Sequence, residues 1–165
     1  SMVAVRQTVY ALNHVPYELR VDPDIMSEIM LAAVQENGLA LQFVGKLHMD
    51  RGIALAAVQA DGFALQFVSN EWRVDPEIML AAVRDTGYAL QFVPLLHMDR
   101  EIALAAVQQN GLAMKYVGRW NMDDEIALAA VRQNGFAYQD VPHRHSPIDR
   151  EIHAIALEAI RSVGR

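Results

Sequence analysis

A chain of 165 residues with 53% apolar side chains is long and apolar enough to form one folded domain, which argues against an intrinsically disordered protein. Its formal net charge of −6 at pH 7 argues against a protein that binds nucleic acid by neutralising phosphates. Because the chain has no cysteine and no apolar run long enough to cross a bilayer, it predicts no disulfide framework, no cysteine-ligated zinc and no membrane insertion.

The same segment recurs along the whole chain, and most copies contain the triplet Ala-Ala-Val, whose last residue we use as an anchor. The five central anchors are 24, 25, 24 and 24 residues apart, and the first and last spacings are both 29. The seven anchors are Val5, Val34, Val58, Val83, Val107, Val131 and Ile160. This period predicts a repeat protein in which residues 1–165 form a single domain. We interpret the chain as a piece of a longer protein, with Ser1 and Met2 as a cleavage scar and a start residue.

Each copy is expected to begin with a helix, and the start signals are clear. Asp22 and Asp75 can each cap the free amide groups of a first turn, and a proline follows at the first helical position. Asp99 has the same place in its copy, where Glu101 adds favourable charge near the positive end of the helix.

A glycine four residues after the anchor predicts the end of this helix. Glycine adopts the left-handed conformation that closes many helices, and we expect that conformation here. These glycines are Gly38, Gly62, Gly87, Gly111 and Gly135. A second short helix is expected after each glycine, ending near Pro94, Gly118 or Pro142.

The Asn-Gly pairs between apolar stretches are also typical of β-hairpin turns. We reject that alternative because the flanking apolar residues do not alternate, and Ile102 and Ala106 have helical spacing. A first helix that is apolar over most of its circumference must be covered on several sides, and stacked neighbours would provide this cover. The predicted fold is therefore all-α, an α-solenoid of tandem short helical hairpins with about 24 residues per hairpin.

The junctions between hairpins alternate along the chain. "ELRVDP" at 18–23 resembles "EWRVDP" at 71–76, whereas "LHMDR" occurs at 47–51 and again at 96–100. This alternation predicts a super-repeat of two hairpins and about 49 residues. Near-identical units are also typical of a designed consensus array, but the longer end spacings weigh against that origin.

The copies "DREIALAAVQQNGLAMKYV", "DPEIMLAAVRDTGYALQFV" and "DDEIALAAVRQNGFAYQDV" resemble the repeat family named domain of unknown function 4116. The resemblance covers nearly the whole chain. It implies a repeat that occurs in effector-type proteins of bacteria living inside eukaryotic cells and in some protists. The family has no assigned catalytic residues, so the resemblance implies none here. The final copy departs from the pattern, with extra residues and Val163 in place of asparagine.

The best candidate for a binding site is a row of residues two positions before each helix cap. Its members are Arg20, His48, Arg73, His97 and Asn121. Repeat geometry predicts that they share one edge of the solenoid, where they would recognise an acidic peptide or partner surface. The alternative is a solvated row beside the capping aspartates. Trp72 and Trp120 are expected at equivalent places and interpreted as packing residues, although a partly exposed tryptophan is a common interface anchor.

Two further polar rows follow the repeat. The second helices contribute one row, which would either bind a segment of a partner or, as we favour, tie one repeat to the next: Asn13, Gln42, Gln66, Gln91, Lys115 and Gln139. The first helices contribute the other, which is expected to be solvated or paired with glutamates: Arg6, Gln35, Gln59, Arg84, Gln108, Arg132 and Arg161.

No motif in the sequence predicts catalysis. It contains no G-x-S-x-G, no phosphate-binding glycine loop and no H-E-x-x-H, so we expect no enzyme, no catalytic residue and no cofactor. In the irregular segment "PHRHSP", His143 and His145 could join His153 around a metal ion, but a turn before the last helix is the better interpretation and no metal is expected.

Two functions remain open at this point. The first is a non-catalytic scaffold that binds a protein or peptide partner, including a host protein if the chain is part of a bacterial effector. The second is a structural spacer that positions a catalytic or membrane-binding domain elsewhere in the parent protein. We expect no nucleic acid partner, some end-to-end self-association, and a location in the cytoplasm or, for an effector, in the host cell cytoplasm.

Overall fold

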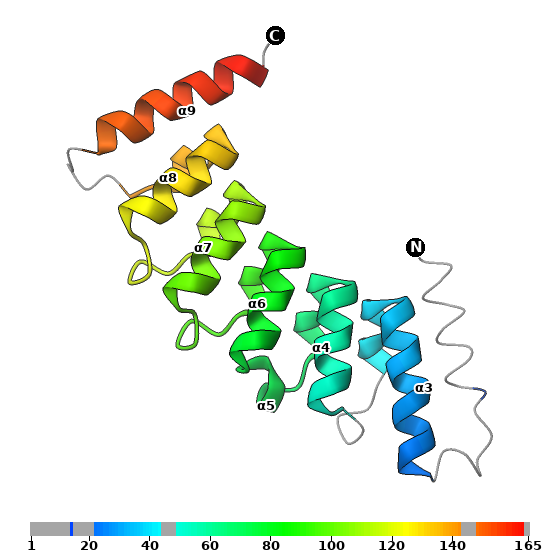
Figure 1. Ribbon diagram of the computed structural model, residues 1–165. Helices are drawn as coiled ribbons and strands as arrows, with labels where there is room; N and C mark the ends of the chain where they lie inside the picture. The colour runs from blue at the N-terminus through cyan, green and yellow to red at the C-terminus, as the bar shows by residue number, and fades with distance from the viewer. Residues whose placement is uncertain (1–13, 15–21, 44–48, 143–147, 164–165) are drawn as a thin grey trace.

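The computed structural model describes residue 14 and residues 22–43, 49–142 and 148–163. The described residues form helices and no strand, and the helices stack one after another into a curved array (Figure 1). The α-helices are α3 (Pro23–Glu36), α4 (Arg51–Ala60), α5 (Asn70–Arg73), α6 (Pro76–Asp85), α7 (Arg100–Gln109), α8 (Asp124–Gln133) and α9 (Asp149–Val163). The 3₁₀ helices are η1 (Gly38–Phe43), η3 (Gly62–Phe67), η4 (Gly87–Phe92), η5 (Gly111–Tyr116) and η6 (Gly135–Asp140). The predicted all-α solenoid is confirmed.

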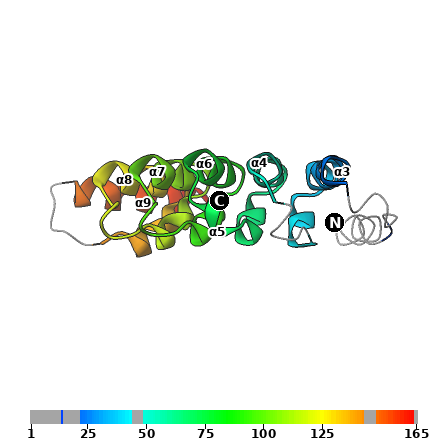
Figure 2. The same ribbon diagram turned by 90° about the horizontal axis from the view of Figure 1, so that it is seen from below.

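Each hairpin pairs one α-helix with one 3₁₀ helix, and the two kinds of helix form two layers (Figure 2). Successive members of the series α3, α4, α6, α7, α8 and α9 contact each other, and so do successive members of the 3₁₀ series. The second helix of each hairpin is thus tighter than an α-helix and six residues long, which is unusually long for 3₁₀ structure.

The predicted helix starts are confirmed. The Asp22 carboxylate accepts a hydrogen bond of 3.0 Å from the Asp24 N–H at the start of α3, and Asp99 Oδ1 accepts one of 2.9 Å from the Ile102 N–H in α7. Asp75 has the same role before α6, which begins with Pro76. These carboxylates satisfy amide groups that have no partner within the first helical turn.

The prediction of left-handed glycines is wrong. The residue that closes α7 is Asn110, whose extended backbone (φ −148°, ψ 109°) lets its N–H donate to Ala106 O. No repeat glycine has a φ in the left-handed region. A Cβ on Gly87 would instead lie 2.5 Å from Ala106 O in the next hairpin. Glycine is needed at these positions because the carbonyl end of the following α-helix packs directly onto the backbone.

The anchor predicted for the last copy is also wrong. A Cβ on Gly135 would meet Ala156 O, just as a Cβ on Gly111 would meet Ala130 O. Leu157 is therefore the counterpart of Val131, at a spacing of 26 rather than 29 residues. The sequence "EAIRSV" after Leu157 has no Asn-Gly pair, so α9 continues to Val163 where the other copies turn into a 3₁₀ helix. Val5, the first anchor, lies outside the described residues.

Candidate functional site

Polar side chains near the ends of α6, α7 and α8 connect each of these hairpins to the previous one. The Gln109 side chain accepts a hydrogen bond of 2.6 Å from the Gly87 N–H and donates one of 2.9 Å to Asp85 O. Gln133 repeats this arrangement one hairpin later, where it accepts from the Gly111 N–H at 2.5 Å. These residues stand two positions after the anchor, and their bonds satisfy backbone groups that the stacking removes from water.

Two arginines join α-helices at every second junction. Arg51 Nε donates to Asp75 Oδ2 at 2.8 Å, and its guanidinium also pairs with Glu77. Arg100 forms the same pair of bonds with the cap and first turn of α8, at 2.6 Å from Asp123. The hydrogen bond from Arg51 lowers the pKa of Asp75, against the opposing effect of partial burial.

The pKa of Asp123 is lowered as well. Burial by itself would raise it, but hydrogen bonds from the Ile126 N–H and from Arg100, together with the arginine charge, have the larger combined effect.

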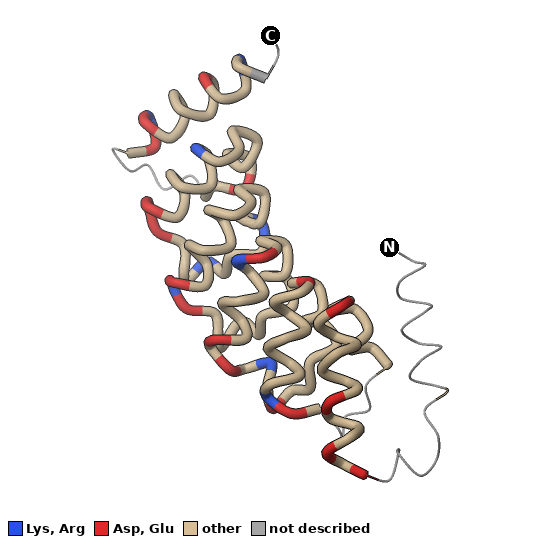
Figure 3. Tube along the Cα trace, turned by 45° about the vertical axis from the view of Figure 1, so that its right-hand side comes forward, with Lys and Arg blue, Asp and Glu red and all other residues tan. Residues whose placement is uncertain are grey.

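Acidic positions gather along the edge formed by the N-terminal ends of the α-helices, with a few basic positions between them (Figure 3).

The row of candidate residues before the caps does not have one common environment. Arg20 and His48 lie outside the described residues. Arg73 is half-buried and donates to Val68 O at 2.7 Å and to Gln66 O at 3.0 Å, at the end of its own 3₁₀ helix. His97 is exposed, and the Asn121 side chain donates to Met98 O at 2.8 Å. Of the three described members, Arg73 and Asn121 form structural contacts and His97 is exposed, so the role of the row in partner binding stays a prediction.

The two tryptophans are not equivalent, contrary to expectation. In the turn after η3, the Trp72 N–H donates a hydrogen bond to Ser69 O. In the equivalent turn after η5, the donor to Gly118 O is the Asn121 N–H, so Asn121 is the counterpart of Trp72. Trp72 packs against the core, and its Nε1 donates to Met49 O at 3.3 Å. Trp120 stands one residue before that counterpart position, and its side chain is 99% exposed.

Trp120 belongs to an apolar surface on the loops that precede α7 and α8. We call Leu95, Leu96 and Trp120 the loop patch. Leu95 is 68% exposed and Leu96 96%. The two loops are neighbours, since a Cβ on Gly118 would lie 3.6 Å from Leu95 Cδ2. Large apolar side chains this exposed on neighbouring loops are typical of interaction sites.

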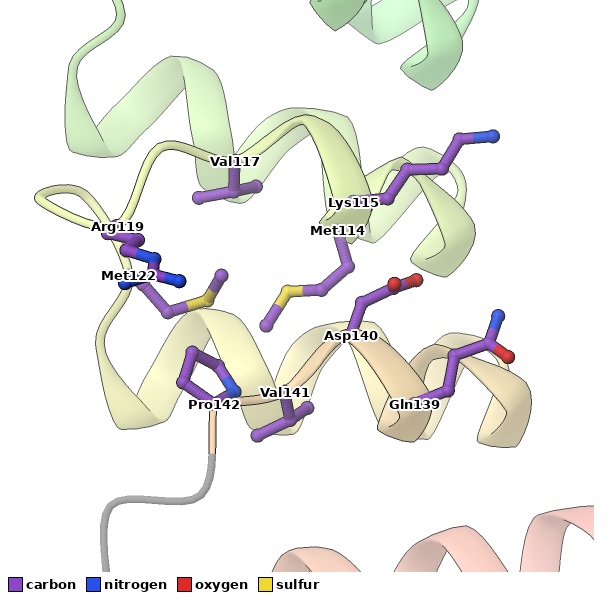
Figure 4. A pocket seen from close by; sticks show the side chains of 9 residues that line it. All are labelled: Met114, Lys115, Val117, Arg119, Met122, Gln139, Asp140, Val141 and Pro142. Carbon is purple, nitrogen blue, oxygen red and sulfur yellow. The ribbon is translucent and has the colours of Figure 1, made fainter.

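A groove of about 750 Å³ lies beside this loop, between the C-terminal ends of η5 and η6. Figure 4 shows its lining, with two methionine side chains extending into the space between the hairpins. The lining residues are Met114, Lys115, Val117, Arg119, Met122, Gln139, Asp140, Val141 and Pro142. Arg119, which lines the groove, directly precedes Trp120, so one loop contributes to both the groove and the loop patch.

The other polar rows are mostly occupied by local contacts. Gln66 Nε2 and Gln91 Nε2 donate to carbonyls three residues earlier in their own 3₁₀ helices, so the prediction that this row ties repeats together is wrong for them. Lys115 Nζ instead lies 4.8 Å from the centre of the Tyr116 ring. In the row on the first helices, Arg84 pairs with Glu101 at 3.6 Å, as expected.

The sequence predicts neither a metal site nor a membrane-spanning segment. The described residues contain no group of three or more histidine, aspartate or glutamate side chains placed to hold a metal ion, and His143 and His145 lie outside them. None of the helices formed by the described residues is long and apolar enough to cross a membrane.

A family model described as "Domain of unknown function (DUF4116)" matches residues 2–47, 50–97 and 99–144. The second match runs from α4 to η4 and the third from α7 to η6, so each contains two hairpins, which agrees with the predicted super-repeat. No curated protein and no solved structure shows significant similarity to the chain. The chain therefore belongs to this repeat family of unknown function, in three tandem copies that together cover most of its length.

Proposed function

We propose that this chain is a non-catalytic scaffold that binds a partner protein through the loop patch and the adjoining groove. The observation that carries the proposal is the exposure of Trp120, at 99%, and of Leu96, at 96%, on two neighbouring loops. Exposing these side chains to water is unfavourable, whereas burying a tryptophan at the centre of an interface commonly contributes much of its affinity.

The use of the polar residues supports a scaffold rather than an enzyme. Gln109, Gln133, Arg51 and Arg100 all join one hairpin to the next. Catalytic groups need free polar atoms that converge on a substrate, whereas these four recurring side chains form contacts between hairpins. The partner is expected in the cytoplasm, which would be that of a host cell if the chain is part of an effector.

The test compares matched surface variants in affinity capture from eukaryotic cell lysate. Leu96→Ser combined with Trp120→Ser removes the two most exposed members of the loop patch, and Gln59→Ser combined with Gln108→Ser changes two exposed polar residues on α4 and α7 as a control. All proteins must melt at the same temperature. We expect a specific partner that the native chain and the control retain and the patch variant loses.

Equal retention by the patch variant would contradict the proposal, and absence of any specific partner would favour the structural spacer. Photo-crosslinking from position 120 adds a direct readout, because Trp120→benzoylphenylalanine should attach covalently to the captured partner. If a second copy of the chain covers the loop patch instead, the mass measured by light scattering should rise with the concentration of the native chain.

A further inference from the structure

We propose that Asn37 and Asn134 are sites of spontaneous deamidation, which converts their side chains to aspartate or isoaspartate, and that Asn110 is protected from the same reaction. This covalent modification is independent of partner binding. One difference between hairpin junctions that are otherwise alike decides which asparagine reacts.

Deamidation of an Asn-Gly pair begins at the backbone nitrogen of the glycine. This nitrogen loses its proton to hydroxide and attacks Cγ of the asparagine, which closes a succinimide ring, and the side-chain nitrogen takes up a proton and leaves as ammonia. Water then opens the ring at either carbonyl, which gives aspartate or isoaspartate. The net reaction consumes one water molecule, releases one ammonia molecule and leaves one new carboxylate, so it needs no oxidant or reductant.

The three Asn-Gly pairs of the chain have the same local structure. Asn37, Asn110 and Asn134 each follow an α-helix with extended backbone, at φ of −151°, −148° and −150°. Each side-chain oxygen accepts a hydrogen bond from the N–H two residues later, at 3.1, 3.0 and 3.0 Å. All three residues are half-buried. The asparagines themselves therefore present the same barrier to ring closure.

The glycine nitrogens differ in their hydrogen bonding. The Gly111 N–H donates to Gln133 Oε1 at 2.5 Å. Gly38 and Gly135 are buried as well, but their N–H groups donate to no residue that the structure describes. At all three sites the stack must open locally before hydroxide can reach the nitrogen. At Gly111 this opening must also break the bond to Gln133, so the reaction there meets an additional barrier.

The cause of this difference lies in the following α-helix. Gln133 stands three residues after Ala130, the residue whose carbonyl packs onto Gly111. At Gly135 the corresponding residue is Ala159, whose Cβ would lie 2.9 Å from a Cβ on the glycine. A methyl group occupies the place of the amide there, and it cannot accept a hydrogen bond.

The same replacement occurs at the junction of α3 and α4. Ala60 stands in the corresponding place opposite Gly38, three residues after the alanine whose carbonyl packs onto that glycine. The junctions between these two carry an acceptor, as at Gly62, whose N–H donates to Asp85 Oδ2 at 2.7 Å. Each alanine therefore leaves one Asn-Gly pair without a bridge to the next hairpin.

The two products should affect the hairpins differently. Aspartate suits the position, since Asp61 Oδ1 accepts a hydrogen bond of 2.9 Å from the Phe63 N–H at the start of η3. Isoaspartate adds one carbon to the main chain and shortens the side chain, so the oxygen that caps η1 or η6 would be displaced. The isoaspartate form is therefore expected to loosen the junction where it arises.

The first experiment follows the reaction in the full chain by mass spectrometry. The purified protein is incubated at mildly alkaline pH and digested with trypsin, which places the three asparagines in separate peptides. We expect Asn37 and Asn134 to react about fivefold faster than Asn110, the factor that one hydrogen bond of ordinary strength gives. A rate at Asn110 equal to or above that of either other site would overturn the proposal.

The chain unfolded in urea is the control for local sequence. Each asparagine precedes a glycine, and the bridge is absent from the unfolded chain, so the three rates should converge. A difference that persisted in urea would show that neighbouring residues in the sequence cause it, which also overturns the proposal.

A substitution that removes the bridge tests its role without changing any asparagine. Gln133→Ala takes away the acceptor of the Gly111 N–H, so deamidation of Asn110 should become about fivefold faster. The rate at Asn37 should stay the same and shows that the rest of the stack is intact. An unchanged rate at Asn110 would mean that its place within the stack protects it, and the bridge would have no part in the protection.

The opposite substitution supplies a bridge where the chain has none. Ala159→Gln places an amide opposite Gly135, so deamidation of Asn134 should slow by a similar factor. Ala60→Gln repeats the test at Asn37, in a different junction. If both variants keep the native Tm and both sites still react at the native rate, the proposed cause of protection is wrong.

Discussion

At the scale of single residues, the repeat glycines determine how closely two hairpins approach. A Cβ on Gly111 would collide with Ala130 O, which is backbone and cannot rotate away. We therefore expect Gly111→Ala to lower the free energy of unfolding by about 1 to 3 kcal/mol through overpacking. Chemical denaturation of the two proteins measures this difference.

Two controls test the cause. A Cβ on Gly118 would meet Leu95 Cδ2 at 3.6 Å, an ordinary contact, so Gly118→Ala should change the stability little. Gly111→Asn should be at least as harmful as Gly111→Ala, because asparagine is larger. Asparagine is tolerated in the left-handed conformation, so a stable Gly111→Asn protein would revive that interpretation and contradict ours.

The glutamine bridges give a second prediction at this scale. Gln109→Ala removes the acceptor of the Gly87 N–H and the donor to Asp85 O, so we expect a loss of about 1 kcal/mol in the free energy of unfolding. The neighbouring Gln108 is exposed and forms no hydrogen bond with any described residue, so Gln108→Ala is the matched control. Equal melting curves for the two variants would show that the bridge does not stabilise the stack.

The sequence identified some of these residues but not their roles. The capping function of Asp99 is local, since its carboxylate bonds within one turn, and residue type and spacing were sufficient to predict it. The role of Gly111 depends on a carbonyl in the next hairpin, which the chain does not reveal before it is stacked. Gln108 and Gln109 look alike in sequence, and only the angular position on α7 distinguishes the bridging residue from the solvated one.

At the scale of helices, the arginine contacts explain why hairpins occur in pairs. Arg51 and Arg100 are the first residues of α4 and α7, and each binds the cap of the following α-helix. The helices that receive these bonds begin with Pro76 and Asp124, which have no guanidinium to extend the series. In the sequence, helices that start with Asp-Arg alternate with helices that start differently. In the structure, junctions with an arginine bound to the next helix cap therefore alternate with junctions that lack this contact.

These contacts predict a pH-dependent contribution of Arg51. Because the pKa of Asp75 is lowered in the folded chain, its contribution to stability is present above the ordinary aspartate pKa of about 3.9 and is lost as the pH falls through the lowered value. Arg51→Met should therefore lower Tm at pH 6, and the difference from the native chain should shrink as the pH falls below about 4. Thermal melts monitored by circular dichroism across this range measure it.

The control for this prediction is Arg84→Met. Arg84 and Glu101 are 3.6 Å apart, and both side chains are more than half exposed, so solvent and salt screen the pair. We expect almost no change in Tm at any pH. A difference for Arg51→Met that stayed constant down to pH 2 would mean that the arginine acts by packing rather than through the carboxylate.

At the scale of the whole molecule, regular stacking makes the irregular positions informative. The period predicted the solenoid, because each apolar first helix needs neighbours on both sides. The exposure of Trp120 could not be predicted from the sequence. Counting back from the helix caps places Trp120 at the position of Trp72, but the loop before α6 has one residue more than the loop before α8. The groove could not be predicted either, because its lining residues come together only when η5 and η6 are side by side.

All of these surfaces depend on the stacked order of hairpins, and distances between spin labels test that order most directly. The chain has no cysteine, so labels attach only where cysteine is introduced. Gln59, Gln108 and Arg132 are exposed and stand one residue after the anchor on α4, α7 and α8. The pair 59 and 108 spans two helix-to-helix steps, and the pair 59 and 132 spans three.

With about 8 to 10 Å between the axes of packed helices, stacking in chain order predicts separations near 20 Å for the first pair and about 8 to 10 Å more for the second. Both distance distributions should be narrow, because each hairpin is bridged to the next. A second distance equal to or shorter than the first would show that the hairpins do not stack in chain order, and it would contradict the solenoid.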